Sequence, residues 1–88
     1  MSVFIGGSAY NMVRDLADGF IIVSERTFRN YGPGEFAEFS REANRLLTEV
    51  RSNQPSLSEV EAIQKRQRRM RRLQQALTIA AVLLQRQR

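Results

Sequence analysis

The sequence predicts an all-α fold, a small helical bundle in which two helices form an antiparallel hairpin and an N-terminal helix packs nearby. Apolar residues recur at intervals of three and four along most of residues 33–86, which is the period of a helix. Gly and Pro cluster at 32–34, where this region begins, and Pro55 stands alone within it and divides it into two helices. Helices joined by a short turn lie antiparallel. The 88 residues suffice for one small domain, 1–88.

The first helix of the predicted hairpin covers residues 32–53, with its regular part from about 33. Gly32 is suited to the N-cap, Pro33 to the first helical position, and Glu35 to the positive end of the helix dipole. The apolar positions then repeat at helical spacing up to the polar stretch 51–55. The residues predicted to pack in the hairpin seam are Phe36, Phe39, Ala43, Leu46 and Val50.

The second predicted helix is long and basic and covers residues 56–86, after a turn at 54–55. It begins at Ser56, because Ser56 and Glu59 have the spacing of a capping box, and no Gly or Pro follows. Its heptad pattern predicts seam positions at Val60, Ile63, Met70 and Leu77. Gln67 and Gln74 also fall on the seam. Their side chains either bond to a neighbouring helix or reach solvent.

Residues 1–31 form an N-terminal segment with two alternative interpretations. Helical spacing predicts a helix from about Ser8, a possible N-cap, to at least Asp18 and at most Asn30. Gly19 interrupts this pattern, however, and Phe20-Ile21-Ile22-Val23 has the composition of a strand. We favour the helix because two helices without intervening strands follow.

The two hairpin helices differ in length, which predicts an uncovered end. At 1.5 Å per residue, helix 34–53 is about 30 Å long and helix 56–86 about 46 Å. The excess falls on residues 76–84, which are apolar on nearly every side. Such a segment must be buried, either by the N-terminal segment or by another chain. The expected apolar anchors for a partner are Ile79, Val82 and Leu83.

Positive charge is concentrated in the last third of the chain. Residues 62–88 hold eight Lys or Arg and no acid, whereas residues 1–61 hold six Arg and nine acids. Thirteen of the fourteen cations are Arg, which grips carboxylates and phosphates bidentately. The predicted electrostatic partner-binding residues are Lys65, Arg66, Arg68, Arg69, Arg71 and Arg72.

The neighbouring helix cannot neutralise this cluster. Residues 37–45 face it in the predicted hairpin, and their two acids are matched by two Arg. Glu42 is expected to pair with Arg66, and the stripe of Glu35, Glu42 and Glu49 to fix the register of the two helices. The remaining charge is either a solvated face or the binding surface for an acidic protein, nucleic acid or membrane, in decreasing order of preference.

Several classes of function are disfavoured by composition. The chain has no Cys and no His, which removes the thiolate nucleophile and the commonest metal ligand. We therefore predict no enzyme activity, catalytic residue, cofactor, metal or small-molecule substrate. No apolar run approaches the roughly 18 residues that span a bilayer, and no signal peptide is visible. A cytoplasmic location, or one inside a larger particle, is expected.

The sequence-based hypothesis for function is a non-enzymatic assembly or adaptor protein. It would bury the apolar overhang in a homo-oligomer or against a partner protein, and dock the Arg-rich helix on an acidic surface. The alternative is a nucleic-acid-binding protein that uses the same cations on phosphates without sequence preference. Residues 40–88 contain no aromatic side chain, so stacking on bases is excluded from this helix.

Overall fold

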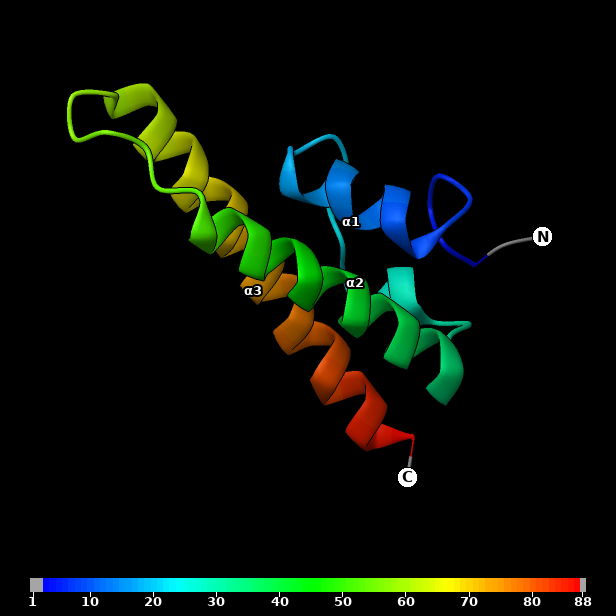
Figure 1. Ribbon diagram of the computed structural model, residues 1–88. Coiled ribbons are helices and arrows are strands. Elements are labelled where there is room, and N and C mark those ends of the chain that lie inside the picture. The colour runs from blue at the N-terminus through cyan, green and yellow to red at the C-terminus, as the bar shows by residue number, and fades with distance from the viewer. Residues whose placement is uncertain (1–2, 88) are drawn as a thin grey trace.

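The computed structural model describes residues 3–87 and contains helices only. In chain order these are α1 (Ala9–Ala17), the short 3-10 helix η1 (Glu25–Phe28), α2 (Pro33–Ser52) and α3 (Val60–Arg86) (Figure 1). No strand occurs within the described range. The predicted all-α bundle is therefore confirmed.

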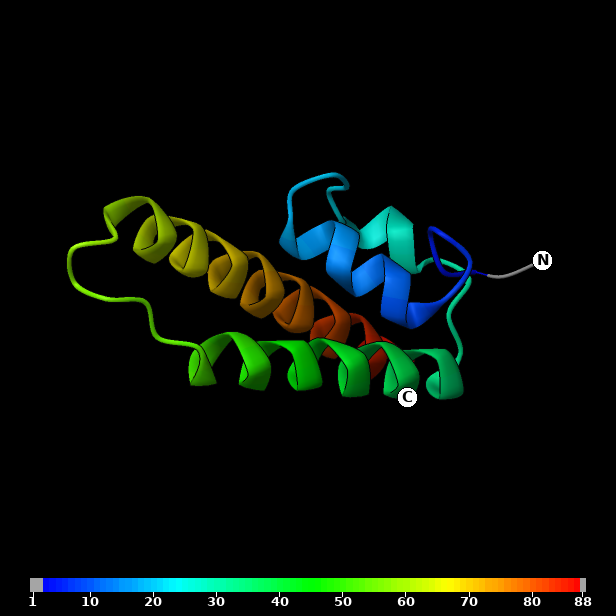
Figure 2. The same ribbon diagram turned by 45° about the horizontal axis from the view of Figure 1, so that its top comes forward.

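Helices α2 and α3 form the antiparallel hairpin. Both α1 and η1 lie over one half of the hairpin's length, where α1 contacts α2 and α3, and η1 contacts α3 (Figure 2). Helix α2 starts as its sequence predicts. Gly32 is the N-cap, Pro33 opens the helix, and the Glu35 carboxylate accepts a hydrogen bond of 2.7 Å from the Gly32 N–H. The helix ends at Ser52, one residue before its predicted end.

Helix α3 begins four residues later than predicted, because residues 56–59 form a turn. The Ser56 N–H donates to the Glu59 carboxylate at 3.1 Å, which is one half of the expected capping box. The other half is missing, since the Ser56 hydroxyl is bonded to Ser58 and the Glu59 N–H donates to the Ser56 carbonyl. The connection is therefore residues 53–59 rather than 54–55, which lets α3 start beyond the end of α2.

The predicted C-terminal overhang is wrong, because the excess length of α3 lies at the connection instead. Gln87 donates a hydrogen bond of 2.6 Å to the Tyr31 carbonyl, so the end of α3 lies beside the start of α2. Arg86 also pairs with Glu25 of η1 at 3.1 Å. At the other end Val60 is 58% exposed, so it is not a seam residue. We call these the closed end, near Tyr31 and Gln87, and the open end, near the connection 53–59.

Helix α1 is short, and the chain after it is irregular. The Ser8 hydroxyl accepts a hydrogen bond of 3.1 Å from the Asn11 N–H, which confirms the predicted N-cap. The helix ends at Ala17, and Gly19 follows with φ of +84°, a conformation that suits glycine. The continuation to Asn30 is therefore wrong. Residues 21–24 form neither helix nor strand before η1 begins.

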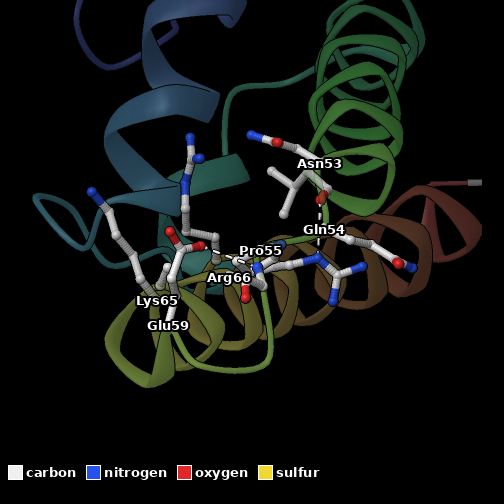
Figure 3. A pocket seen from close by; sticks show the side chains of 10 residues that line it. Asn53, Gln54, Pro55, Glu59, Lys65 and Arg66 are labelled. Atoms are coloured by element: carbon white, nitrogen blue, oxygen red, sulfur yellow. Dashed lines mark hydrogen bonds between the residues drawn. The ribbon is translucent and has the colours of Figure 1, made fainter.

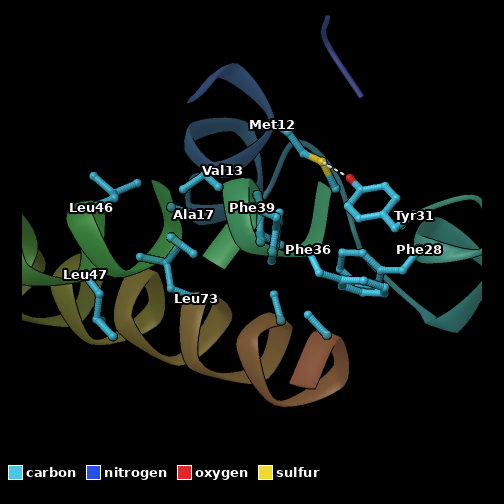
Figure 4. Packing of buried hydrophobic residues seen from close by; sticks show 14 of the residues in the cluster. Met12, Val13, Ala17, Phe28, Tyr31, Phe36, Phe39, Leu46, Leu47 and Leu73 are labelled. Carbon is cyan, nitrogen blue, oxygen red and sulfur yellow. Dashed lines mark hydrogen bonds between the residues drawn. The ribbon is translucent and has the colours of Figure 1, made fainter. Parts of the chain in front are cut away.

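The core extends along the hairpin, and its buried aromatic rings, four in number, meet at the closed end (Figure 4). The Phe28 ring lies 5.1 Å from those of Tyr31 and Phe39, edge to face, which is a favourable geometry for aromatic pairs. The Tyr31 hydroxyl donates to Met12 sulfur at 3.1 Å. The five seam residues predicted on α2 are all buried: Phe36, Phe39, Ala43, Leu46 and Val50.

On α3 the seam lies on a different face from the one predicted. Among the predicted positions, Ile63, Met70 and Leu77 are half-buried at its edge, whereas Gln67 and Gln74 are exposed and reach solvent. The residues that face the core also follow 3-4 spacing but include two cations. They are Arg66, Arg69, Leu73, Ala76, Ala80 and Leu83. The small Ala76 and Ala80 are fully buried within the cluster that contains the aromatic rings.

Candidate functional site

The basic cluster of α3 divides into two rows that face different directions. Arg66, Arg69 and Arg72 are half-buried and form what we call the inward row. Lys65, Arg68 and Arg71 are exposed and form the outward row. Successive members of a row are three residues apart, and three residues of an α-helix rotate about 60° less than a full turn. Each row therefore winds slowly around α3. The inward row consequently passes from the α2 side of the helix to the α1 side.

Arg66 caps the C-terminus of α2. Its Nε and Nη2 atoms donate to the carbonyls of Val50 and Arg51 at 3.2 and 3.1 Å. The last carbonyls of a helix lack backbone partners and carry the negative end of its dipole, so a guanidinium stabilises them. Glu42 bonds to Arg45 at 3.8 Å instead, and the predicted Glu42–Arg66 pair is wrong.

Arg72 performs the same task for α1. Its Nη1 atom donates to the Ala17 carbonyl at 3.0 Å. The guanidinium lies directly against Gly19, where an added Cβ would come within 2.9 Å of the Arg72 Cζ. Glycine at position 19 is therefore favoured both by its positive φ and by the close approach of Arg72.

Arg69 lies between the two capping residues. Its Nε atom is 3.3 Å from the Asp18 carboxylate, and the side chains are only partly exposed. That Nε atom is buried without a hydrogen bond of good geometry. All three residues of the inward row thus hold the helices together, and they are poorly placed to bind a partner.

A cleft of about 410 Å³ opens between α2 and α3 at the open end (Figure 3). Lys65, Arg66 and Arg69 line it together with the connection between the helices. The Glu59 carboxylate and the carbonyl end of α2 lie at the same cleft and offset these cations. The cleft is therefore not a concentrated anion site, despite its three basic side chains.

The acidic stripe of α2 does not reach α3. Glu35 holds the N-terminus of its own helix, Glu42 bonds within α2, and Glu49 pairs with Arg14 of α1 at 3.3 Å. The prediction that the stripe fixes the register against α3 is wrong, because Glu42 and Glu49 lie on the side of α2 that faces α1 and Glu35 bonds at the N-terminus of α2 itself. Within residues 3–87 the side chains of the outward row form no salt bridge and no hydrogen bond.

The predicted apolar anchors are mostly occupied by the protein itself. Ile79 and Leu83 are half-buried and pack against the core, whereas Val82 is 41% exposed. The largest exposed apolar side chains lie elsewhere, at Phe20, Ile22 and Leu57, which are 78, 90 and 92% exposed. Sequence reasoning missed them as binding candidates. For Phe20 and Ile22 the detectable signal was their position in an apolar run that follows Gly19, where the helical pattern is broken.

No family model matches the chain, and no curated protein and no solved structure matches it either. In the described part of the chain, no helix is both long and apolar enough to cross a membrane. The same residues contain no group of three or more acidic, His or Cys side chains that could hold a metal ion. The outward row of α3 is thus the candidate site that geometry and charge define best.

Proposed function

We propose that this protein is a non-enzymatic adaptor that docks the outward row of α3 on an acidic surface of a partner protein. The observation that supports the proposal is the state of Lys65, Arg68 and Arg71. They are exposed and have no ion-pair partner among the described residues, while the inward row caps neighbouring helices. Ile79 and Leu83 are not part of the proposed surface, because they pack against the protein's own core.

Three features of the outward row favour an interface over simple solubility. Its members lie at intervals of three on a helix, where like charges repel and cost a few tenths of a kcal/mol each. Two of the three are Arg, whose planar fork suits carboxylates. Helix α3 is also already folded and packs on α1 and α2, so its backbone need not fold when it binds.

An acidic protein surface fits this row better than nucleic acid does. With three free cations, about three phosphates could be contacted, and log K would fall with log salt at a slope near −2.7. Such binding is weak at physiological salt. The helix also lacks aromatic side chains on which bases could stack.

The test uses fluorescence anisotropy with a labelled poly-glutamate peptide as the acidic probe. We expect the triple variant Lys65→Gln/Arg68→Gln/Arg71→Gln to bind the probe about tenfold more weakly than the native chain, from three exposed ion pairs. The matched control is Arg26→Gln/Arg29→Gln/Arg41→Gln. It removes the same charge from three other exposed Arg residues.

Two outcomes would count against the proposal. Equal losses in the two triple variants would mean that net charge alone attracts the probe. Tighter binding of duplex DNA or RNA than of the peptide, at matched ionic strength, would favour the nucleic-acid alternative instead.

A further inference from the structure

The segment Phe20–Val23 lies at the surface and has the exposure pattern of a strand. Phe20 and Ile22 are 78 and 90% exposed, whereas Ile21 and Val23 are half-buried and pack against the core. Alternation with a period of two is the property of extended backbone. Ser24, which follows, also has extended backbone angles, with φ of −144° and ψ of 179°.

The backbone of this segment has no hydrogen-bond partner. Within residues 3–87, neither the N–H nor the carbonyl group of Ile21, Ile22 or Val23 forms a hydrogen bond. The unbonded stretch is bounded on both sides, because the Phe20 N–H donates to Asp15 and the Ser24 N–H to Thr27. An unpaired extended segment with aromatic and β-branched residues is a template for another strand.

We propose that two copies of the chain associate by antiparallel pairing of their Phe20–Ile22 segments, around a twofold axis at Ile21. In this register Phe20 lies opposite Ile22 of the second copy, and Ile22 lies opposite its Phe20. Both exposed side chains therefore gain an apolar neighbour. Aromatic and β-branched residues form favourable cross-strand pairs.

Other registers fit less well. A shift by one residue would place Phe20 opposite Val23 of the second copy, so that an outward side chain would face an inward one. A shift by two would place Phe20 opposite Ser24. In the proposed register the nearest acid on one side, Asp18, also lies opposite the neutral Ser24, so no like charges meet there.

The second copy is favoured over an unrelated partner because this patch is complementary to itself. It carries two projecting side chains, Phe20 and Ile22, beside a groove of about 320 Å³. Apolar side chains of Leu16, Ile21 and Val23 form much of the groove wall, and no acid lines it. In a twofold interface the same patch is present on both copies, so Phe20 and Ile22 of one copy meet Ile22 and Phe20 of the other, and the groove lies next to this contact. Leu57 is as exposed, but no groove of this kind adjoins it.

Sedimentation velocity of the full chain, across concentrations up to millimolar, tests this proposal. We expect a monomer–dimer equilibrium for the native chain and a monomer for Ile22→Asp. Leu57→Asp is the matched control, because it adds the same charge at an equally exposed position and should leave the equilibrium unchanged. Both positions are exposed, so neither change should unfold the protein.

Amide hydrogen exchange supplies a second readout that is specific for strand pairing. In an antiparallel pair only alternate residues exchange hydrogen bonds, and the Phe20 N–H is already bonded to Asp15. The Ile21 amide should therefore exchange more slowly as the protein concentration rises, whereas the Ile22 amide should not, and the protection of Ile21 should vanish in Ile22→Asp. A native chain that stays monomeric at millimolar concentration would overturn the proposal. So would a dimer without protection at Ile21, or one that Leu57→Asp dissociates equally.

This proposal goes beyond the adaptor function and fails or succeeds separately from it. Each copy carries a formal charge of +5, so added salt should screen the repulsion and maintain or strengthen the dimer. Binding of the acidic probe by the outward row should weaken under the same conditions. Opposite responses to salt therefore identify which of the two interactions is present.

Discussion

The two ends of the α2–α3 hairpin are built from different residues along the same row of α3. At the closed end this row consists of Ala76 and Ala80, which are fully buried among aromatic rings. At the open end it consists of Arg66 and Arg69, which are only half-buried. A cleft of about 410 Å³ opens between the two helices at the second end.

The difference teaches how one helix can serve both stability and binding. Small side chains let α3 approach the aromatic cluster, where burial of large rings supplies most of the hydrophobic stabilisation. Long Arg side chains span the wider space at the open end by bonding to helix carbonyls rather than by filling it. The open end therefore exposes charge while the closed end holds the fold, a division that mutations can test.

The largest expected difference between the ends concerns Phe39, which is 0% exposed at the closed end. Phe39→Ala should lower the free energy of unfolding by about 3–5 kcal/mol, because it removes a buried ring and leaves a cavity. Val60→Ala at the open end should change it by less than about 0.5 kcal/mol. Urea denaturation of the two variants measures both values. Similar losses would show that the two ends are equally well packed.

Helix α2 could be predicted from sequence because its signals are local. Gly32, Pro33 and Glu35 act within one turn, and the apolar positions of α2 all belong to one face. The face of α3 could not be predicted in the same way. A heptad assignment counts apolar residues, and it rejected the row that contains Arg66 and Arg69. These two are turned inward by the ends of α2 and α1, which are tertiary partners invisible in the sequence of α3.

The candidate site was predicted in part. All six cations of the cluster belong to α3, but Arg66, Arg69 and Arg72 face inward and bond to the neighbouring helices. The side chains of Lys65, Arg68 and Arg71 are exposed and have no ion-pair partner among the described residues. The predicted place of the overhang was wrong because it depended on the length of the connection between α2 and α3. A turn at residues 56–59, closed by Ser56 and Glu59, shifts the start of α3 outward and moves the excess length to the open end.

The second expected effect is smaller: the stability of the closed end should depend on pH. Burial raises the pKa of Tyr31 to about 12, with a further contribution from the negative charge of Glu35. The folded protein therefore retains this proton at pH values where the unfolded chain, with a pKa near 10, has lost it. The associated stability is complete below pH 10 and is lost as the pH rises toward 12, by about 2 kcal/mol.

Urea denaturation at several alkaline pH values measures this loss. Tyr31→Phe is the control, since it keeps the ring and removes the ionisable group, and its stability should fall less over the same interval. A native chain whose stability falls no more than that of the variant would mean that the Tyr31 hydroxyl is not desolvated at the closed end.

The smallest expected effect separates the inward row from the outward row at the open end. Arg66→Met should lower the free energy of unfolding by about 1 kcal/mol, because two carbonyls at the end of α2 lose a charged donor while the apolar stem is kept. Arg68→Met removes an equal charge from an exposed residue and should change stability by less than about 0.5 kcal/mol. The order should reverse for binding of the acidic probe, where Arg68→Met causes the larger loss. If both changes lowered stability equally, the division of the basic cluster into a structural row and a binding row would be wrong, because Arg68 would then also hold the hairpin together.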